Sequence, residues 1–352
     1  MFTISLCMIV KNESQTLPRI LNCAKQFCDE IIIVDTGSTD TTKEIALSYT
    51  DKVFSFRWND NFSNARNYAF EHATCDYQMW LDADDFISQK EIEKIVKLKK
   101  TTASADVFMF NYATTFDENN NPTFVYQRER LLKRTCNFKW QGFVHEAITP
   151  SGKIEQCDIT IEHRKERISD PKRNLRLYQK AKKRGVRFSP REQYYYAREL
   201  YYNSHISSAI KNLKVFLKQP NLFEADHLGA VLLLGDCLKN KNQIENAINV
   251  FHNYIKSHTP TAELCCKLAN LFELNKNIPN ALFWYESALI CEKQTFGFVQ
   301  KDYEQFIPFL ELSRLYFFID FCKAKFFHEK AKAIRPKHPS VVFNEQFFRN
   351  KV

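Results

Sequence analysis

Short apolar runs alternate with helix-like segments in the first 85 residues, and this alternation limits the fold more than any other feature of the chain. The apolar runs are residues 4–10, 30–35, 53–56 and 77–81. Between them, apolar side chains recur at helical spacing, as in the segment from Ser14 to Ala24. Ser14 is expected to cap the helix in that segment, and Ser63 the helix that follows the third run. Strands that alternate with helices form parallel sheets through right-handed crossovers. The sequence therefore predicts an α/β domain with a mostly parallel sheet, whose ligand site lies beyond the carboxyl ends of the strands.

Three carboxylates, Asp82, Asp84 and Asp85, follow the fourth apolar run directly. Carboxylates at a strand end repel one another unless something offsets their charge, and a divalent cation with oxygen ligands is a common partner. Such a cation shares its remaining positions with water and substrate phosphates. The pattern therefore indicates a metal–diphosphate site, and a turn followed by a helix N-cap is the alternative.

Other polar side chains follow the remaining strands. Glu13 comes after the first run and Asp35 ends the second, while Arg66 lies at the start of the helix after the third. Since the carboxyl ends of parallel strands share one edge of a sheet, we expect these side chains and Asp82 to converge on one cleft. A surface ion pair for Arg66 and a structural cap for Glu13 are the alternatives.

The composition argues against several other kinds of protein. The chain has only seven glycines and neither the GxGxxG nor the GxxxxGK[ST] pattern, so we expect no glycine-rich phosphate cradle. Its eleven cysteines include no CxxC pair, which fits the reduced thiols of a cytoplasmic protein. No apolar run approaches the roughly 18 residues of a membrane span. Residues 1–10 are expected to form a strand rather than a signal peptide.

The net charge of +9 originates in residues 164–191, where twelve Lys and Arg residues accompany two acidic ones. A segment of this charge attracts phosphates, an acidic partner or an anionic membrane surface. We therefore expect either peripheral membrane contact or phosphate binding, with the solvated face of a helix as the alternative. A nucleic-acid partner is not expected, because few aromatic residues are interleaved with the basic ones.

Four ordered segments carry a resemblance to a known family. They are Ser5–Glu13, Val34–Asp40, Ala65–Asn67 and Leu81–Asp85. Their order and spacing resemble the signature of family 2 glycosyltransferases of the GT-A fold over residues 3–90. The resemblance implies a GT-A nucleotide-sugar-binding domain that transfers a sugar, expected to be a hexose, from a nucleotide-diphosphate donor such as a UDP-sugar.

The resemblance also implies roles for the residues at the strand ends. Asp35 would hold the uracil or ribose, Arg66 the nucleotide or its phosphates, and Glu13 is a further candidate for donor binding. Asp82 would lie at the sugar or ribose. Asp84 would bind Mg²⁺ or Mn²⁺ that bridges the diphosphate.

Three more residues complete the implied donor site. Asp85 would be a second metal or sugar contact. Many GT-A enzymes finish the metal site with a late histidine that precedes a mobile basic segment, and His163 fits that position in the order of the chain. Arg164, followed by Lys165 and Arg167, would then provide positive charge over the diphosphate, while a loop histidine without a metal is the alternative for His163.

The segment Trp140–Glu146 resembles the acceptor-side motif of a subgroup of the family. Inverting transfer needs a base within hydrogen-bond reach of the acceptor's attacking atom. Glu146 is the candidate for this base, although many family members have a Glu-Asp pair in its place. His145 is expected to be the base itself, to orient Glu146, or to be a packing histidine.

Helical periodicity replaces strand patterns from about residue 191. Small residues recur at Ala209, Ala247, Ala281 and Ala324, which are 38, 34 and 43 residues apart. This pattern resembles tetratricopeptide repeats, which are helix pairs of about 34 residues. We therefore expect a GT-A domain over residues 1–165, a basic lid or linker helix over 166–190 and an all-α repeat domain over 191–340.

This architecture is similar to that of bacterial peptide S-glycosyltransferases of the bacteriocin type, so a peptide or a glycan is the expected acceptor. The alternative is a non-catalytic repeat scaffold that binds peptide or protein partners. Aromatic residues between Phe317 and Phe327 exceed what one helix face can bury. They predict a homodimer or domain interface through the repeats, with an ordinary core as the alternative.

Overall fold

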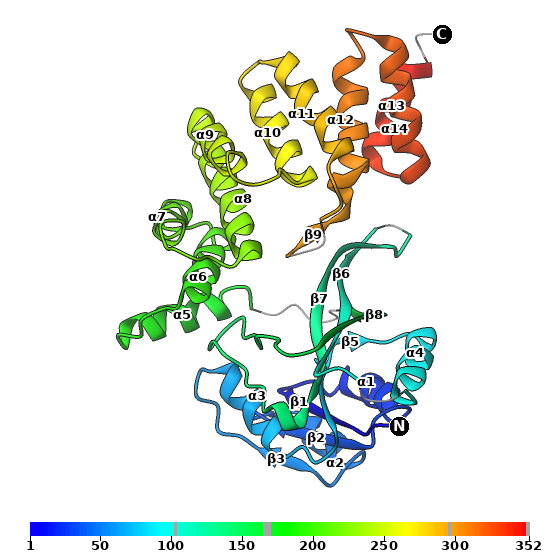
Figure 1. The fold of residues 1–352 in the computed structure, drawn as a ribbon, viewed down its shortest axis with the longest axis vertical. Helices are drawn as coiled ribbons and strands as arrows, with labels where there is room; N and C mark the ends of the chain where they lie inside the picture. The colour runs from blue at the N-terminus through cyan, green and yellow to red at the C-terminus, as the bar shows by residue number, and fades with distance from the viewer. Residues whose placement is uncertain (102–103, 118, 165–169, 295–296, 350–352) are drawn as a thin grey trace. The chain divides into compact units, whose positions relative to one another are not determined.

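The structure is a computed structural model that describes residues 1–101, 104–117, 119–164, 170–294 and 297–349 (Figure 1). It divides into two compact units. The sheet unit comprises Met1–Thr114 and Tyr126–Arg187, and the helical unit comprises Thr115–Val125 and Phe188–Val352. Residues 166–169 of the predicted lid, and Lys165, lie outside the described residues. The rest of that segment contains helix α5, which is part of the sheet unit.

The sheet follows the order β3-β2-β1-β4-β7-β6-β8-β5. Its strands are β1 (Ile4–Val10), β2 (Glu30–Asp35), β3 (Val53–Ser55), β4 (Tyr77–Trp80), β5 (Asp85–Phe86), β6 (Val107–Phe116), β7 (Pro122–Lys133) and β8 (Ile154–His163). The first four strands pair in parallel, as predicted, and β7 pairs with β4 antiparallel. A short strand, β9 (Val299–Gln300), pairs with Phe124 and Val125 at the end of β7 that belongs to the helical unit.

Both faces of the parallel sheet are covered, which explains why β2 is buried along its whole length. Ile31 and Ile33 pack into a core with helix α1 (Leu17–Ala24). Ile32 and Val34 point to the opposite core, where helix α3 (Phe62–Glu71) packs. Helices α2 (Thr42–Leu47), α4 (Gln89–Lys99) and α5 (Arg173–Lys183) complete the sheet unit, with a 3₁₀ turn at Arg134–Cys136.

Two predicted helix caps were wrong. Helix α1 begins after Thr16 rather than Ser14, and Pro18 occupies its first turn, where a missing N–H is tolerated. Helix α3 is capped by Asn61, whose side chain accepts a hydrogen bond from the Asn64 N–H at 3.1 Å. Ser63 lies inside the first turn of α3 instead. Asn61 and Ser63 have nearly equal preference for the cap of α3, whereas Thr16 precedes α1 without a side-chain cap hydrogen bond.

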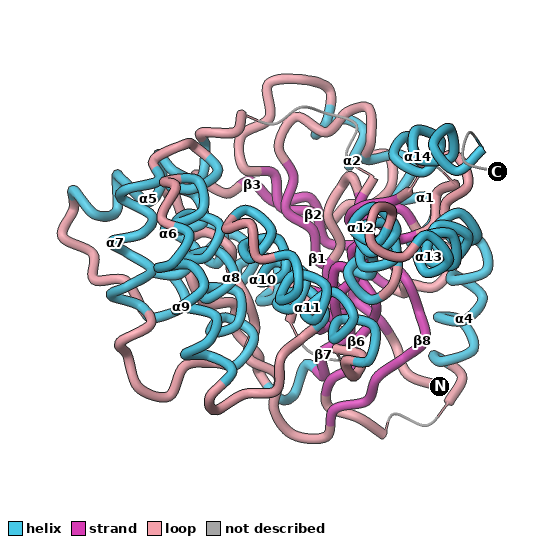
Figure 2. Tube along the Cα trace, turned by 90° about the horizontal axis from the view of Figure 1, so that it is seen from above, coloured by secondary structure: helices cyan, strands magenta, loops and turns pink. Residues whose placement is uncertain are grey.

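Consecutive helices of the helical unit lie side by side in pairs (Figures 1 and 2). They are α6 (Pro190–Tyr202), α7 (Ile206–Phe216), α8 (Glu224–Asn240), α9 (Ile244–Ile255), α10 (Ala262–Leu274), α11 (Ile278–Ile290), α12 (Phe306–Tyr316), α13 (Phe321–Ile334) and α14 (Pro339–Arg349). The alanines that define the predicted repeat are all fully buried. A Cβ added to Gly235 of α8 would approach Phe251 of α9 to 2.2 Å, so this position requires the smallest residue.

The predicted aromatic cluster is divided between core and surface. Phe317 packs against Phe321 and Phe348, with ring centroids 5.7 and 5.2 Å away. Phe318 is 88% exposed and Phe326 is also exposed. No helix among the described residues has the length and apolar character needed to cross a membrane.

Candidate functional site

A cavity of about 670 Å³ opens at the carboxyl ends of β1 and β4. Its walls include seven of the residues predicted to form the site. These are Glu13, Arg66, Asp82, Asp84, His145, Glu146 and His163. Residues far apart in the sequence therefore come together where the parallel topology places strand ends.

Asp35 lies at the end of β2 but is engaged by its own loop. Its carboxylate accepts hydrogen bonds from the backbone N–H of Gly37 at 3.1 Å and of Ser38 at 3.1 Å. Thr36, rather than Asp35, is among the residues that line the described cavity. The role of Asp35 in nucleotide binding stays a prediction.

Glu13 also combines a structural contact with a place on the cavity wall. Its carboxylate accepts a hydrogen bond from the Thr16 hydroxyl at 2.7 Å, next to the start of α1. The backbone N–H of Leu17 donates to the Glu13 carbonyl at 2.9 Å. These contacts tie Glu13 to the start of α1, and donor binding by Glu13 stays a prediction.

Arg66 bridges two carboxylates of the cavity wall. Its Nε donates to Glu146 Oε1 at 2.6 Å and its Nη2 donates to Asp82 Oδ1 at 2.8 Å. The guanidinium lies 4.8 Å from the centre of the Trp140 ring, and its Nη1 is buried without a hydrogen-bond partner among the described residues. Burial raises the pKa of Asp82, but the charge and hydrogen bond of Arg66 outweigh it and lower the pKa to about 2. Asp82 is therefore ionised and held in one orientation.

A tight loop presents Glu146 and His145 to the cavity. Gln141 and Ala147 exchange two backbone hydrogen bonds, of 2.9 and 3.0 Å, which close the loop between them. His145 has a φ of 53°, a backbone conformation that is uncommon for residues other than glycine. The closed loop fixes both adjacent side chains on the cavity wall.

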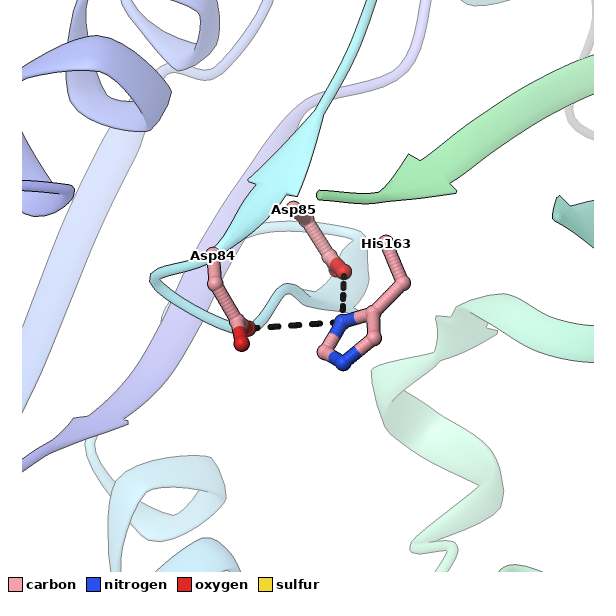
Figure 3. A group of neighbouring side chains, drawn as sticks. All are labelled: Asp84, Asp85 and His163. Atoms are coloured by element: carbon pink, nitrogen blue, oxygen red, sulfur yellow. Dashed lines mark ion pairs between the residues drawn. The ribbon is translucent and has the colours of Figure 1, made fainter. Parts of the chain in front are cut away.

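Asp84, Asp85 and His163 form a cluster beside the cavity (Figure 3). Strands β5 and β8 pair antiparallel so that Asp85 and His163 lie opposite each other. His163 Nδ1 is 3.4 Å from Asp84 Oδ1 and 3.5 Å from Asp85 Oδ1. One ligand atom from each residue lies within 4.8 Å of the others, a spacing that a single metal ion could bridge.

The electrostatics of Asp84 and His163 suit a divalent cation. The pKa of Asp84 is raised to about 6, mainly by burial. The charge of His163 lowers this pKa, and the charges of Asp82 and Asp85 raise it further. Burial lowers the pKa of His163, but the hydrogen bond and charges of these aspartates reverse the shift and raise it. The crowded carboxylates thus carry negative charge that the described side chains only partly offset, and a cation would remove their repulsion.

Asp85 is placed differently from Asp84. It is fully buried, and its Oδ1 accepts a hydrogen bond from the Tyr112 hydroxyl at 2.8 Å. Its Oδ2 accepts from the Asp82 N–H at 3.0 Å and from Arg130 Nη1 at 3.2 Å. The half-buried Asp84 and His163 therefore fit the role of cation ligands best, while Asp85 holds the loop that contains Asp84 through the Asp82 N–H.

Arg130 is the main residue that the sequence reasoning missed. It is completely buried, donates to the Trp80 carbonyl at 3.0 Å as well as to Asp85, and lies 3.6 Å from the centre of the Trp80 ring. Arg128, on the same face of β7, lines the cavity, and its guanidinium lies 4.5 Å from the centre of the Trp80 ring. Arg128 and Arg130 alternate along β7, the strand that pairs with β4 next to the aspartates. This alternation was the feature of the sequence that could have revealed them.

The basic segment contributes to the cavity through its second part. Asp170, Arg173 and Asn174 line the wall near the start of α5, and Arg173 lies 5.1 Å from the centre of the Phe62 ring. Arg164 forms an ion pair with Glu162 at 2.7 Å, and its backbone N–H donates to the Asp84 carbonyl at 2.9 Å. Lys165 and Arg167 lie outside the described residues.

Comparison with known proteins shows what the sheet unit is similar to. Residues 5–151 match the model of glycosyl transferase family 2. A TPR repeat-containing protein of Synechococcus elongatus is 34% identical over 152 residues, which are 43% of this chain and 36% of that protein. The SPbeta prophage-derived glycosyltransferase SunS of Bacillus subtilis is 30% identical over 148 residues, which are 41% of this chain and 34% of SunS.

The chain thus spans about a third of the length of these relatives. Among solved structures, residues 1–349 of S. aureus TarS superpose with a TM-score of 0.37 at 13% identity, covering 81% of this chain and 90% of that one. Residues 5–151 of the sheet unit are thus similar to glycosyl transferase family 2, and helices that resemble tetratricopeptide repeats follow them.

Proposed function

We propose that this chain is an inverting, metal-dependent glycosyltransferase. It would transfer a sugar, expected to be a hexose, from a nucleotide-diphosphate donor such as a UDP-sugar to a peptide or glycan acceptor. The observation that carries the proposal is that one cavity has both a pair of groups suited to a divalent cation, Asp84 and His163, and a carboxylate suited to be a base, Glu146.

Asp84 and His163 would hold Mg²⁺ or Mn²⁺. Asp85 would support them through its contacts with the Asp82 N–H and with the His163 ring. When bound, the cation offsets the negative charge that develops on the departing diphosphate. Asp82, fixed by Arg66, would accept hydrogen bonds from hydroxyl groups of the donor's sugar or ribose. The buried Nη1 of Arg66 is one donor that a bound phosphate or sugar oxygen could satisfy.

Glu146 would act as the general base. Arg66 holds its Oε1, so that Oε2 is left to accept the proton of the acceptor's hydroxyl or thiol. The acceptor's oxygen or sulfur then forms a bond to the anomeric carbon while the bond from that carbon to the diphosphate breaks. Attack from the face opposite the leaving group inverts the anomeric configuration.

The helical unit is the candidate for acceptor binding. Stacked helix pairs of this type form extended surfaces that bind peptides or other proteins. A thiol or a hydroxyl would suit the same base, so both peptide and glycan acceptors agree with the proposal. A scaffold without activity is less consistent with a cavity that keeps Asp82, Asp84, Arg66 and Glu146 together.

Donor screening tests the proposal. The purified chain is incubated with Mn²⁺ or Mg²⁺ and a panel of nucleotide sugars, and the released nucleotide is measured. We expect release from at least one donor, loss of at least 100-fold for Asp84→Ala, and unchanged release for the control Asp51→Ala, an exposed carboxylate outside the cavity. Absence of release from every donor, or full release by Asp84→Ala, would contradict it.

A further inference from the structure

Two cysteines of the helical unit lie in direct contact. The Sγ atoms of Cys265 and Cys291 are 3.6 Å apart. Cys265 belongs to α10, whereas Cys291 directly follows the last residue of α11. Within the described part of the chain, no other two thiols form a hydrogen bond with each other.

The two thiols differ in their access to solvent. Cys265 is fully buried in the core between α10 and α11. Cys291 is half-buried and lines a second cavity, of about 150 Å³, together with Glu263 and Tyr303. A small oxidant can therefore reach Cys291 through this cavity. Cys265 does not line the cavity and is reached only through its contact with Cys291.

The contact also differentiates the two thiols chemically. The hydrogen bond with Cys265 lowers the pKa of the Cys291 thiol against the effect of burial. The same hydrogen bond, together with burial, raises the pKa of Cys265. Thiolates rather than thiols react with oxidants, so Cys291 is the more reactive of the two. The adjacent Cys266 is engaged elsewhere, with its Sγ 3.9 Å from the Tyr303 carbonyl.

We propose that Cys265 and Cys291 form a redox-active pair that hydrogen peroxide converts reversibly into a disulfide. The Cys291 thiolate attacks one peroxide oxygen, the O–O bond breaks, and the leaving hydroxide takes a proton to form water. The resulting sulfenic acid is attacked by the Cys265 sulfur, which loses its proton as the S–S bond forms and a second water leaves. Two thiols are thereby oxidised by two electrons, and one peroxide is reduced to two waters.

The two sulfur atoms already lie close to bonding distance. A disulfide bond of about 2.05 Å requires the two sulfur atoms, which are 3.6 Å apart, to approach by roughly 1.5 Å. The bond would fasten the end of α11 to α10, across 26 positions of the sequence. A thiol reductant would reverse it by exchange at the more accessible Cys291 sulfur.

Peptide mapping tests the proposal. The folded, full-length chain is treated with a small excess of hydrogen peroxide, the remaining thiols are alkylated in denaturant, and the unreduced digest is analysed by mass spectrometry. We expect one dominant cross-link between the peptides that contain Cys265 and Cys291, and two fewer free thiols than the eleven of the reduced chain. Dithiothreitol should restore all eleven.

Two variants test which cysteines form the cross-link. Cys291→Ser should abolish the cross-link, whereas the matched control Cys266→Ser, a change at the next position of the same helix, should keep it. A reduced chain that yields no cross-link, or cross-links spread equally over other cysteines, would overturn the proposal. The mapping of the unaltered chain decides the question even if a variant does not fold.

Discussion

Replacement of Arg130 by methionine should destabilise the sheet unit strongly. The guanidinium of Arg130 and the carboxylate of Asp85 are both fully buried and form an ion pair of 3.2 Å. Removal of one partner leaves the other charge in the interior without compensation, which costs about 3–5 kcal/mol of unfolding free energy. The lost contact between the guanidinium and the Trp80 ring, 3.6 Å from its centre, acts in the same direction.

A double variant separates the charge effect from the loss of packing. Asp85→Asn combined with Arg130→Met removes both charges, and the new amide oxygen can still accept from the Tyr112 hydroxyl. We expect the double variant to be more stable than Arg130→Met alone, with an interaction free energy of about 1–3 kcal/mol. The control Arg134→Met changes an exposed arginine of the same unit and should cost less than about 1 kcal/mol.

Urea unfolding followed by tryptophan fluorescence measures these effects. Of the four tryptophans, Trp58, Trp80 and Trp140 lie in the sheet unit, so the signal reports mainly on that unit. The reasoning would be refuted if Arg130→Met cost less than about 1 kcal/mol. It would also be refuted if the costs of the two single changes simply added in the double variant.

Three other predictions concern the base, an acid-sensitive carboxylate and the helical repeats. Glu146→Gln should leave donor binding intact but lower the transfer rate by about 100-fold or more, because the amide cannot take the acceptor's proton; equal rates would place the base elsewhere. Burial raises the pKa of Glu30, but hydrogen bonds from Lys52 and other donors lower it to about 2, below the unfolded value of 4.5. The ionised form therefore stabilises the fold by up to about 3 kcal/mol above pH 4.5, and this contribution is lost as the pH falls towards 2. In urea unfolding at several pH values, Glu30→Gln should differ most from the unaltered chain near neutrality, and a constant difference would contradict the assignment. Gly235→Ala should lower the unfolding free energy of the helical unit by about 1–3 kcal/mol, because the added methyl group would clash with Phe251. Thermal unfolding monitored by circular dichroism measures this loss, and Ser207→Ala, a change at an exposed site, is the control.

The sequence predicted the parts of the fold that depend on local patterns. The four parallel strands follow from their apolar, β-branched runs, and the cavity at their carboxyl ends follows from the topology. The repeats follow from small residues such as Ala247, whose burial between helices leaves no room for larger side chains. These features require no knowledge of which distant residues meet.

Other features depend on contacts between distant segments. The pairing of β5 with β8 decides that Asp85 lies opposite His163, and no local pattern contains that register. Arg130 is a charged residue that is stable in the interior only because Asp85 and Trp80 surround it, so its burial could not be inferred from its own side chain. The cap of α3 depended on a choice between Asn61 and Ser63, which have nearly equal preference for that position.

The central claim is that Asp84 and His163 hold a divalent cation that binds a nucleotide diphosphate, and calorimetric titration tests it most directly. UDP is titrated into the chain with and without Mn²⁺, and the titration is repeated with Asp84→Ala and with the control Asp51→Ala. The account predicts UDP binding that requires Mn²⁺, weakens at least tenfold in Asp84→Ala and is unchanged in the control. Binding of equal strength without the metal, or in Asp84→Ala, would contradict it.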